Sequence, residues 1–184
     1  MADMNETSVK RMEKSVNALK EEFNTIRTGR ASANLFDRVR VDYYGEKSPL
    51  SQVANIAIPE ARMVVITPWD KGLIAEIEKA ILRSELGLNP SNDGKVIRIA
   101  IPPLTADRRK ELVKQAKTIA ENSRVAVRNI RRDGNEELKK MQKDGSITED
   151  ELKTAEDSLQ KSTDKFIAEI NKIFEEKEKE ILEG

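Results

Sequence analysis

Three segments of this chain place apolar residues at alternating spacings of three and four, and this pattern constrains the fold more than any other feature of the sequence. The segments lie within residues 1–29, 105–143 and 149–183. Each is predicted to form a long helix with one apolar stripe, as in a coiled coil. A helix of this kind cannot bury its stripe alone, so we expect the three helices to pack together as a bundle.

The apolar positions also indicate how the helices face and where they end. The first stripe consists of Val9, Met12, Val16, Leu19, Phe23 and Ile26. The second consists of Leu112, Ala116, Ile119, Ser123, Ala126 and Ile130. Gly29 is a typical residue just beyond a helix end, so the first helix is expected to end near Thr28. Thr148 and Glu151 form a T-x-x-E capping box, which predicts the start of the third helix.

Between the first two stripes the pattern changes to short runs that are typical of strands. These runs are RVRVDYY (38–44), the stretch through Val53, Ile56 and Ile58, RMVVITP (62–68) and KVIRIAIPP (95–103). A helical pattern precedes Gly87, and the NPSNDG sequence after it has turn composition. Residues 31–104 are therefore predicted to form a small α/β unit, inserted into a bundle made of residues 1–29 and 105–184.

The chain would cross between the bundle and the inserted unit twice, near residues 29–31 and 102–105. Two short connections favour a hinge over a long flexible linker. Glycine allows the widest range of backbone conformations in such a segment. The predicted hinge residues are Gly29, Arg30, Ala31, Pro102, Pro103, Leu104 and Thr105.

The few aromatic residues lead to two smaller expectations. Trp69 is expected to pack at the start of the helix in the inserted unit. Tyr43 and Tyr44 are neighbours on a strand, so their rings should lie on opposite faces, one in the core and one exposed.

The composition excludes several classes of function. The chain has neither cysteine nor histidine, which removes thiolate nucleophiles, the usual general base at neutral pH and the commonest metal ligands. A glycine-rich phosphate loop is absent, and no apolar run approaches the roughly 20 residues that span a bilayer. The first residues lack the apolar core of a secretory signal. We therefore expect a cytoplasmic protein with no metal site, no membrane contact and no enzymatic activity.

The net charge of zero conceals a strong segregation of charge. Residues 105–143 contain twelve Lys or Arg and six Asp or Glu, whereas residues 144–184 contain six and thirteen. On a helix, one group of basic residues of the first segment falls within roughly 60° of Lys110. The group comprises Lys110, Lys114, Lys117, Arg124, Arg128, Arg131, Arg132, Lys139 and Lys143. Only Glu121 interrupts it, as far as Arg132.

Three readings of this basic stripe remain open from the pattern alone. It could bind phosphate, it could pair with acidic residues of the last helix, or it could simply be solvated. Arginine dominates its centre, which suits bidentate contacts to phosphate oxygens. Because aromatic residues are sparse, contacts to the backbone of folded RNA are favoured over base stacking.

An ordered set of motifs resembles the ribosome recycling factor family. The motifs are IRTGRAS (26–32), DYYG (42–45), ELGLNP (85–90), IPPLTADRRKEL (101–112) and RVAVRNIRRDGN (124–135). The resemblance runs from the first helix to the last. It implies an α+β fold with a long three-helix bundle and an inserted small β/α/β domain, in an L shape with a tRNA-like outline. The family often has alanine where this chain has Gly134, which suggests a softer helix there.

The resemblance also implies a function and partners. Members of the family split post-termination ribosomes into subunits together with elongation factor G, which hydrolyses GTP, so the factor needs no cofactor of its own. The expected partners are the 70S-type ribosome, chiefly its large-subunit rRNA, and elongation factor G, with the factor itself a monomer. The rRNA-binding residues expected from the motifs and the stripe are Arg27, Arg30, Arg109, Lys117, Arg124, Arg128, Arg131 and Arg132.

Two other functions fit the residue pattern. One is an RNA-binding helical chaperone that acts without a GTPase. The other is a structural adaptor in which the basic and acidic helices pair with one another.

Overall fold

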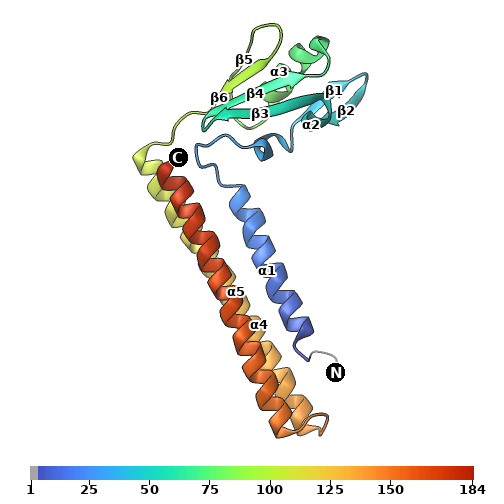
Figure 1. Cartoon of the computed structure of the whole chain (residues 1–184), viewed down its shortest axis with the longest axis vertical. Helices are drawn as coiled ribbons and strands as arrows, with labels where there is room; N and C mark the ends of the chain where they lie inside the picture. Colours follow the sequence, from blue (N-terminus) through green and yellow to red (C-terminus); the bar gives the residue numbers. More distant parts are fainter. Residues whose placement is uncertain (1–3) are drawn as a thin grey trace. The chain divides into compact units, whose positions relative to one another are not determined.

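The computed structural model describes residues 4–184 and contains a helical bundle and a small α/β unit (Figure 1). The bundle unit comprises the chain up to Ile26 together with Ala106–Glu183, and the small unit comprises Arg27–Thr105. The predicted α+β fold, a long helical bundle with an inserted small domain, is confirmed. Residues 1–3 of the predicted first segment lie outside the described residues. A hinge at 29–31 and 102–105 concerns motion and stays a prediction.

Three long helices form the bundle. They are α1 (Glu6–Asn24), α4 (Ala106–Lys143) and α5 (Glu149–Glu183). In Figure 1, α4 runs antiparallel to the other two. The parallel arrangement of α1 and α5 agrees with two contacts between them, Asn5 Nδ2 to Ala155 O at 2.9 Å and Lys20 Nζ to Glu169 Oε1 at 3.0 Å. The apolar stripes meet in a continuous core, as the heptad-like spacing predicts.

The core residues of the bundle confirm most of the predicted phases. On α1 they include Met12, Val16, Leu19 and Phe23. On α4 they are Leu112, Ala116, Ala120, Ser123, Val127, Ile130, Gly134 and Leu138. Ile119 and Ala126 are only half-buried, so the core side of α4 is turned slightly toward Ala120 and Val127. This rotation brings Arg124 and Arg131 closer to the neighbouring helix than the sequence pattern suggests.

The first helix ends earlier than expected. The last residue of α1 is Asn24, and the N–H groups of Thr25 and Ile26 bond to carbonyls three residues back, which tightens the final turn. Gly29 has a positive φ of 76°, as a C-cap glycine would. However, it lies five residues beyond the helix, in the segment that crosses into the small unit. The expectation that Gly29 caps α1 is therefore wrong.

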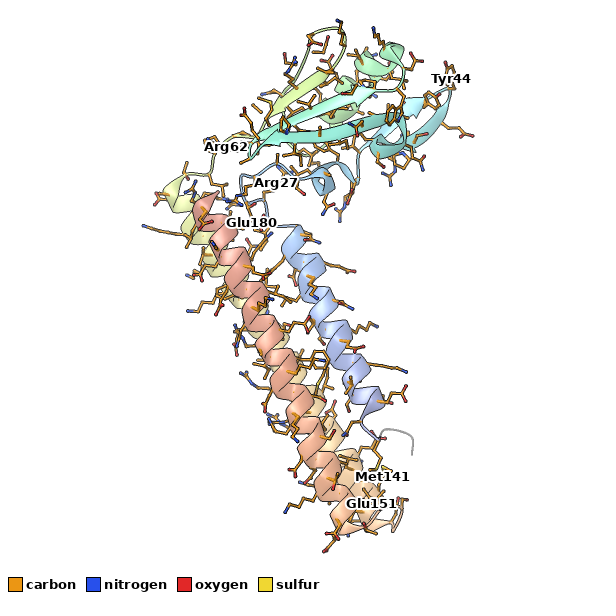
Figure 2. All side chains as sticks on the ribbon, in the orientation of Figure 1. Arg27, Tyr44, Arg62, Met141, Glu151 and Glu180 are labelled. Atoms are coloured by element: carbon orange, nitrogen blue, oxygen red, sulfur yellow. The ribbon has the colours of Figure 1, made fainter. Side chains whose placement is uncertain are left out.

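The start of α5 follows the prediction. Glu151 N donates to Thr148 Oγ1 at 3.2 Å, and Thr148 N donates to Glu151 Oε2 at 2.8 Å, forming the reciprocal capping box. Figure 2 labels Glu151 beside the turn that joins α4 to α5. The turn itself places Gly145 at a positive φ of 81°.

Gly134 has a packing role that the sequence analysis did not anticipate. It lies buried within α4, and a Cβ added there would meet Leu159 Cδ2 of α5 and Ser8 Oγ of α1, each at 2.8 Å. The three helices approach one another closely at this position. The missing side chain therefore permits a close contact among all three helices, which a softer helix alone does not explain.

The small unit contains two antiparallel sheets and a covering helix. Its elements are a 3-10 turn (Ala33–Phe36), β1 (Arg40–Tyr43), β2 (Glu46–Pro49), α2 (Leu50–Val53), β3 (Ala54–Glu60), β4 (Met63–Pro68), a 3-10 turn (Lys71–Leu73), α3 (Ile74–Arg83), β5 (Pro90–Asn92) and β6 (Ile97–Ala100). Strands β1 and β2 form a hairpin, and the larger sheet has the order β3-β4-β6-β5. Its core joins α3 to both sheets through residues such as Ile77, Ile81, Ile66 and Ile99.

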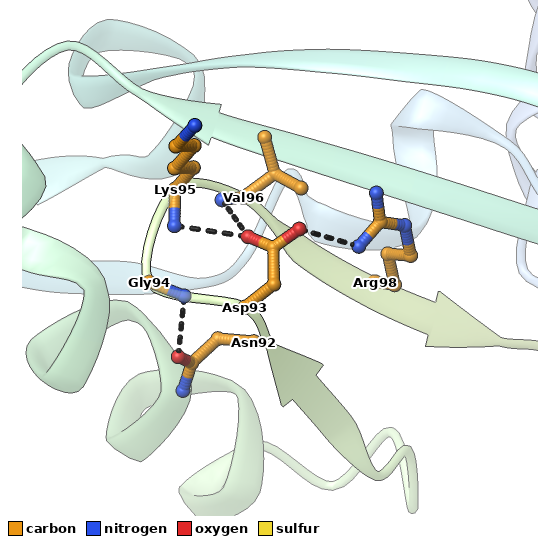
Figure 3. Close-up of polar contacts among 6 residues, drawn as sticks. All are labelled: Asn92, Asp93, Gly94, Lys95, Val96 and Arg98. Carbon is orange, nitrogen blue, oxygen red and sulfur yellow. Dashed lines mark hydrogen bonds and ion pairs between the residues drawn. The ribbon is translucent and has the colours of Figure 1, made fainter.

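Two strands, β2 and β5, were not expected from the sequence. Strand β5 includes Pro90, which is tolerated because β5 lies at the edge of the sheet. The turn after it is held by Asp93, whose Oδ1 accepts from the N–H groups of Lys95 and Val96 at 2.9 Å, while Oδ2 accepts from Arg98 Nη1 at 2.8 Å (Figure 3). The Val96 N–H, then Arg98 and the Lys95 N–H, hold the pKa of the Asp93 carboxyl below its ordinary value.

The aromatic residues of the small unit are more exposed than expected. Trp69 is 69% exposed, so it does not pack into the start of α3. Tyr43 and Tyr44 are also both exposed, with their ring centroids 4.7 Å apart. Tyr44 lies in the turn between β1 and β2 at a positive φ of 48°, beside Gly45 (Figure 2). The turn breaks the strand alternation that predicted one buried ring.

Candidate nucleic-acid interface

The basic residues of α4 lie outside the buried core side of the helix, some fully exposed and some half-buried beside α5. The core side is defined by buried residues such as Ala120, Val127 and Gly134. We use the name basic face for a set of seven residues of α4. They are Lys110, Lys114, Lys117, Arg124, Arg128, Arg131 and Arg132.

Several side chains of the basic face make no ion pair. Lys110, Lys114, Lys117 and Arg132 are exposed, and the side chain of each forms no hydrogen bond or ion pair with any residue between 4 and 184. Asp133, the acidic neighbour of Arg132, instead bonds to Arg11 of α1 at 3.1 Å. These four cations are therefore available to a ligand without breaking any contact within the protein.

Glu121, which lies between Lys117 and Arg124 along this side of α4, holds two of the arginines. Glu121 Oε2 accepts from Arg124 Nη1 at 2.8 Å, and Oε1 accepts from Arg128 Nη1 at 3.2 Å. The hydrogen bond from Arg124, and then that from Arg128, lower the pKa of the Glu121 carboxyl. The trio keeps one net positive charge, and the Arg128 side chain remains 43% exposed.

Neutral amides of α5 position the two arginines nearest to the core. Arg124 Nε donates to Asn171 Oδ1, and Arg131 Nη1 donates to Gln160 Oε1, both at 2.8 Å. An amide oxygen orients a guanidinium without cancelling its charge. Pairing with acidic residues of the last helix, one of the readings left open above, is therefore not what holds Arg124 and Arg131.

Asn171 and Gln160 were missed by sequence reasoning, although the sequence contains a signal for them. They directly follow the core residues Ile170 and Leu159, and they lie eleven residues apart, so they fall on the same side of α5. Most exposed residues of α5 are charged, so two uncharged polar side chains at equivalent positions beside its buried residues indicate a shared role. That role is to position side chains of the neighbouring helix.

The remaining predicted RNA-binding residues have different surroundings. Arg109 is half-buried, and its Nη1 donates to Leu182 O at 3.1 Å, so it joins the beginning of α4 to the end of α5. Arg27 belongs to the small unit, where Nη1 and Nη2 donate to Leu86 O at 2.7 Å and Glu85 O at 3.1 Å (Figure 2). Arg30 is exposed and also belongs to the small unit. The other predicted residues all lie on α4.

The predicted hinge residues form two adjacent segments of the small unit. Ala31 N donates to Ala61 O at 2.7 Å, and Ile101 N donates to Arg62 O at 2.8 Å, so both segments are tied to the turn between β3 and β4. Gly29 lies against Leu104, because a Cβ added to Gly29 would be 3.1 Å from Leu104 Cγ. The contact brings the two predicted crossing segments together.

Residues 4–184 contain neither of two other kinds of site. No cluster of three or more acidic side chains has the arrangement needed to hold a metal ion. No helix in this part of the chain combines the length and apolar character needed to cross a membrane.

Comparison with known proteins adds decisive information. The sequence profile of a family described as "Ribosome recycling factor" matches residues 19–182. The chain belongs to the ribosome recycling factor family. It is 72% identical over 174 residues to the ribosome-recycling factor of Treponema denticola, covering 95% of this chain and 94% of that protein. It is also 55% identical to the protein of the same name from Caldicellulosiruptor bescii, with 100% of both chains covered.

Solved structures of the ribosome recycling factor family have the same fold. A solution structure of a ribosome recycling factor superimposes with a TM-score of 0.79 at 46% identity, covering 99% of this chain and 97% of that one. A second is described as models for the T. thermophilus ribosome recycling factor and the E. coli elongation factor G bound to the E. coli post-termination complex. It matches with a TM-score of 0.65 at 45% identity and covers 97% of each chain.

Proposed function

We propose that this chain acts in the cytoplasm as a monomeric, non-enzymatic translation factor that splits post-termination ribosomes into subunits. Elongation factor G is the partner that hydrolyses GTP. Membership in the ribosome recycling factor family supports the proposal, as does the similarity to a factor bound to the post-termination complex with elongation factor G. The observation that carries the proposal is the basic face, in which four exposed cations along the first two-thirds of α4 make no ion pair within residues 4–184.

In this proposal the basic face anchors the bundle to large-subunit rRNA. Phosphate contacts from Lys and Arg supply affinity without reading sequence, which suits a rigid helix lying against folded RNA. Asn171 and Gln160 hold Arg124 and Arg131 in place before RNA arrives, so less side-chain entropy is lost on binding. Arg128 and Arg132 supply the exposed guanidinium groups for phosphate oxygens.

The inserted unit supplies the part of the molecule that moves. A hinge at residues 29–31 and 102–105 would let the small unit turn while the bundle stays bound, because few residues need to change conformation. Gly29 at positive φ provides the permissive position in one crossing segment. Arg27, which bonds to the carbonyls of Glu85 and Leu86, would hold the first crossing segment to the small unit during this motion.

The proposed function is tested by light scattering of assembled 70S ribosomes carrying a post-termination complex. We expect the scattering to fall only when this chain, elongation factor G and GTP are all present. A fall in scattering without elongation factor G or GTP would instead indicate an RNA chaperone that acts alone. If scattering is unchanged and the chain does not bind ribosomes, the proposed function is wrong.

Two variants of the basic face and one control variant connect the assay to this surface. Arg132→Gln removes an exposed cation that makes no contact within the described chain, so splitting should weaken while thermal unfolding is unchanged. Lys161→Gln removes an exposed cation from α5, outside the basic face, and serves as the matched control. Arg131→Gly should also weaken ribosome binding, but it removes the hydrogen bond to Gln160 as well, so it separates the two effects less cleanly.

A further inference from the structure

The small unit contains a cleft that neither the family match nor the basic face explains. It lies between the β1–β2 hairpin and one side of α3, and its volume is about 210 Å³. Its lining includes the buried Val39 and the half-buried Ala80, and the other lining residues are charged or polar.

The cleft has an excess of three positive charges. Its cations are Arg38, Arg40, Lys47, Lys79 and Arg83. Its carboxylates are Asp42 and Glu76. The cations come from three separate parts of the unit, namely Arg38 and Arg40 just before and at the beginning of β1, Lys47 on strand β2, and Lys79 and Arg83 on helix α3. Bringing like charges together from separate segments costs electrostatic energy unless a ligand of opposite charge compensates for them.

Contacts within the protein account for only two of the five cations. Lys79 Nζ pairs with Glu76 Oε1 at 3.0 Å, one turn away on α3. Arg40 Nη1 donates to Asp37 O at 2.7 Å, which fixes the guanidinium beside the cleft.

Three cations of the cleft have side chains that make no contact of this kind. The side chains of Arg38, Lys47 and Arg83 form no hydrogen bond or ion pair within the described part of the chain. Lys47 is in register with Asp42 across the hairpin, yet the two make no ion pair. Arg83 lies in the last turn of α3, where it interacts favourably with the helix dipole. That role explains neither Arg38 nor Lys47, which lie outside the helix.

We propose that this cleft binds a phosphate group. Arginine side chains that approach from two directions suit the several oxygens of a phosphate, because each guanidinium can donate two parallel hydrogen bonds. The phosphate could belong to an RNA backbone or to a compact polyphosphate chain such as that of a free nucleotide. The proposal concerns residues of the small unit only and stands independently of the proposed function in ribosome splitting.

The experiment is a titration of the full-length, isotopically labelled protein followed by NMR at low salt. One series uses inorganic tripolyphosphate, and a second uses a short RNA hairpin. We expect saturable shifts of the backbone amides around Arg38, Lys47 and Arg83, which weaken as salt is added. Shifts with tripolyphosphate would show that a compact phosphate chain is sufficient for binding to the cleft. Shifts with RNA alone would show that the ligand is the phosphodiester of an RNA backbone.

Two double variants show whether the cleft itself is responsible. Arg38→Gln combined with Arg83→Gln should raise the dissociation constant for the cleft by about tenfold or more, since hydrogen bonds to charged groups are strong. Lys71→Gln combined with Lys95→Gln removes the same charge from exposed positions of the same unit that do not line the cleft. This control should change the dissociation constant by less than about threefold.

Three results would overturn the proposal. The first is that neither probe shifts the amides of the cleft at low salt. The second is that shifts occur only along α4, which would assign all the binding to the basic face. The third is that the two double variants weaken binding equally, which would show that binding depends on the net charge of the protein and not on the cleft. None of these results bears on the light-scattering assay, so the two proposals can fail separately.

Discussion

Individual side chains on α4 differ in what they can give to a ligand. Lys117 and Arg132 are exposed and unpaired within residues 4–184, whereas Arg124 and Arg131 already bond to amides of α5. We infer that the two groups have different roles. Arg124 and Arg131, which bond to α5, define the geometry of the surface, and the unpaired cations supply most of the electrostatic attraction. Glu121 moderates the surface, because it neutralises part of the charge of Arg124 and Arg128.

Replacement of Glu121 by Gln should strengthen ribosome binding. The variant removes the only carboxylate among the cations between Lys114 and Arg132, so the affinity should rise about two- to fivefold at low salt. Binding of labelled protein to 70S ribosomes at several salt concentrations measures this change. An unchanged or lower affinity would mean that Glu121 acts mainly by orienting its two arginines.

The same variant gives a pH prediction with a definite sign. Since the arginines lower the pKa of Glu121 in the folded protein, the ion pairs stabilise the fold above the ordinary glutamate pKa of about 4.3. That contribution disappears as the pH falls through the lowered value. The difference in melting temperature between wild type and Glu121→Gln should therefore be present at neutral pH and vanish in acid. A difference that grows with acidification would contradict the assignment.

Gly29 offers a second test on a single residue, with an internal control. An alanine at Gly29 must adopt a positive φ and also approach Leu104 Cγ at 3.1 Å, whereas at Gly87 the φ is positive but the space around it is open. The strained backbone costs about 1–2 kcal/mol in both variants. Denaturant unfolding should show that Gly29→Ala is the more destabilising of the two. Equal losses would mean that Leu104 moves aside without cost.

Among the helices, those of the bundle were the most predictable from sequence. The second stripe predicted a helix from 105 to about 143, and α4 spans Ala106–Lys143, because its period is sustained over many turns and ends at turn residues. The capping box at Thr148 was also predicted correctly, since both of its partners are local in sequence.

Other features depended on contacts that are distant in sequence. Strands β2 and β5 are short and polar, and they exist because a neighbouring strand supplies their hydrogen bonds. Gly29 has its positive φ in the segment that crosses between the units and not in a helix cap. The residues around Gly29 are compatible with either role, so the local sequence could not distinguish the two.

The candidate site was predicted only in part, for a similar reason. Periodicity placed Lys117, Arg128 and Arg132 on one side of α4, because that depends on the helix alone. It could not show that Arg131 contacts Gln160 of α5 or that Arg109 contacts Leu182, because those bonds depend on how α4 and α5 pack.

The packing of the three helices around Gly134 gives a prediction for a double-mutant cycle. Gly134→Ala gains helix propensity of about 1 kcal/mol, but its Cβ would lie 2.8 Å from Ser8 Oγ and from the flexible end of Leu159. Ser8→Ala removes the hydroxyl from this contact. Gly134→Ala should therefore be more favourable in the Ser8→Ala background than in the wild type, by about 0.5 kcal/mol or more. Strict additivity in urea unfolding would show that Ser8 moves freely.

The entire chain combines a charged bundle and an inserted unit whose joining segments are tied to the turn between β3 and β4. The net charge of zero is misleading, because it is the sum of a basic α4 and an acidic α5. An RNA-binding factor benefits from such asymmetry, since the acidic side disfavours RNA and only one side can bind.

The salt dependence of ribosome binding tests the claim that the basic face of α4 anchors this chain to ribosomal RNA. The measurement compares the slope of log affinity against log salt for Lys117→Gln/Arg132→Gln with that for Lys153→Gln/Lys161→Gln, a control with the same charge loss on α5. Two lost phosphate contacts should reduce the steepness of the slope by about 1.4–1.8 and weaken binding, while the control keeps the wild-type slope. Identical slopes for the two variants would contradict the claim.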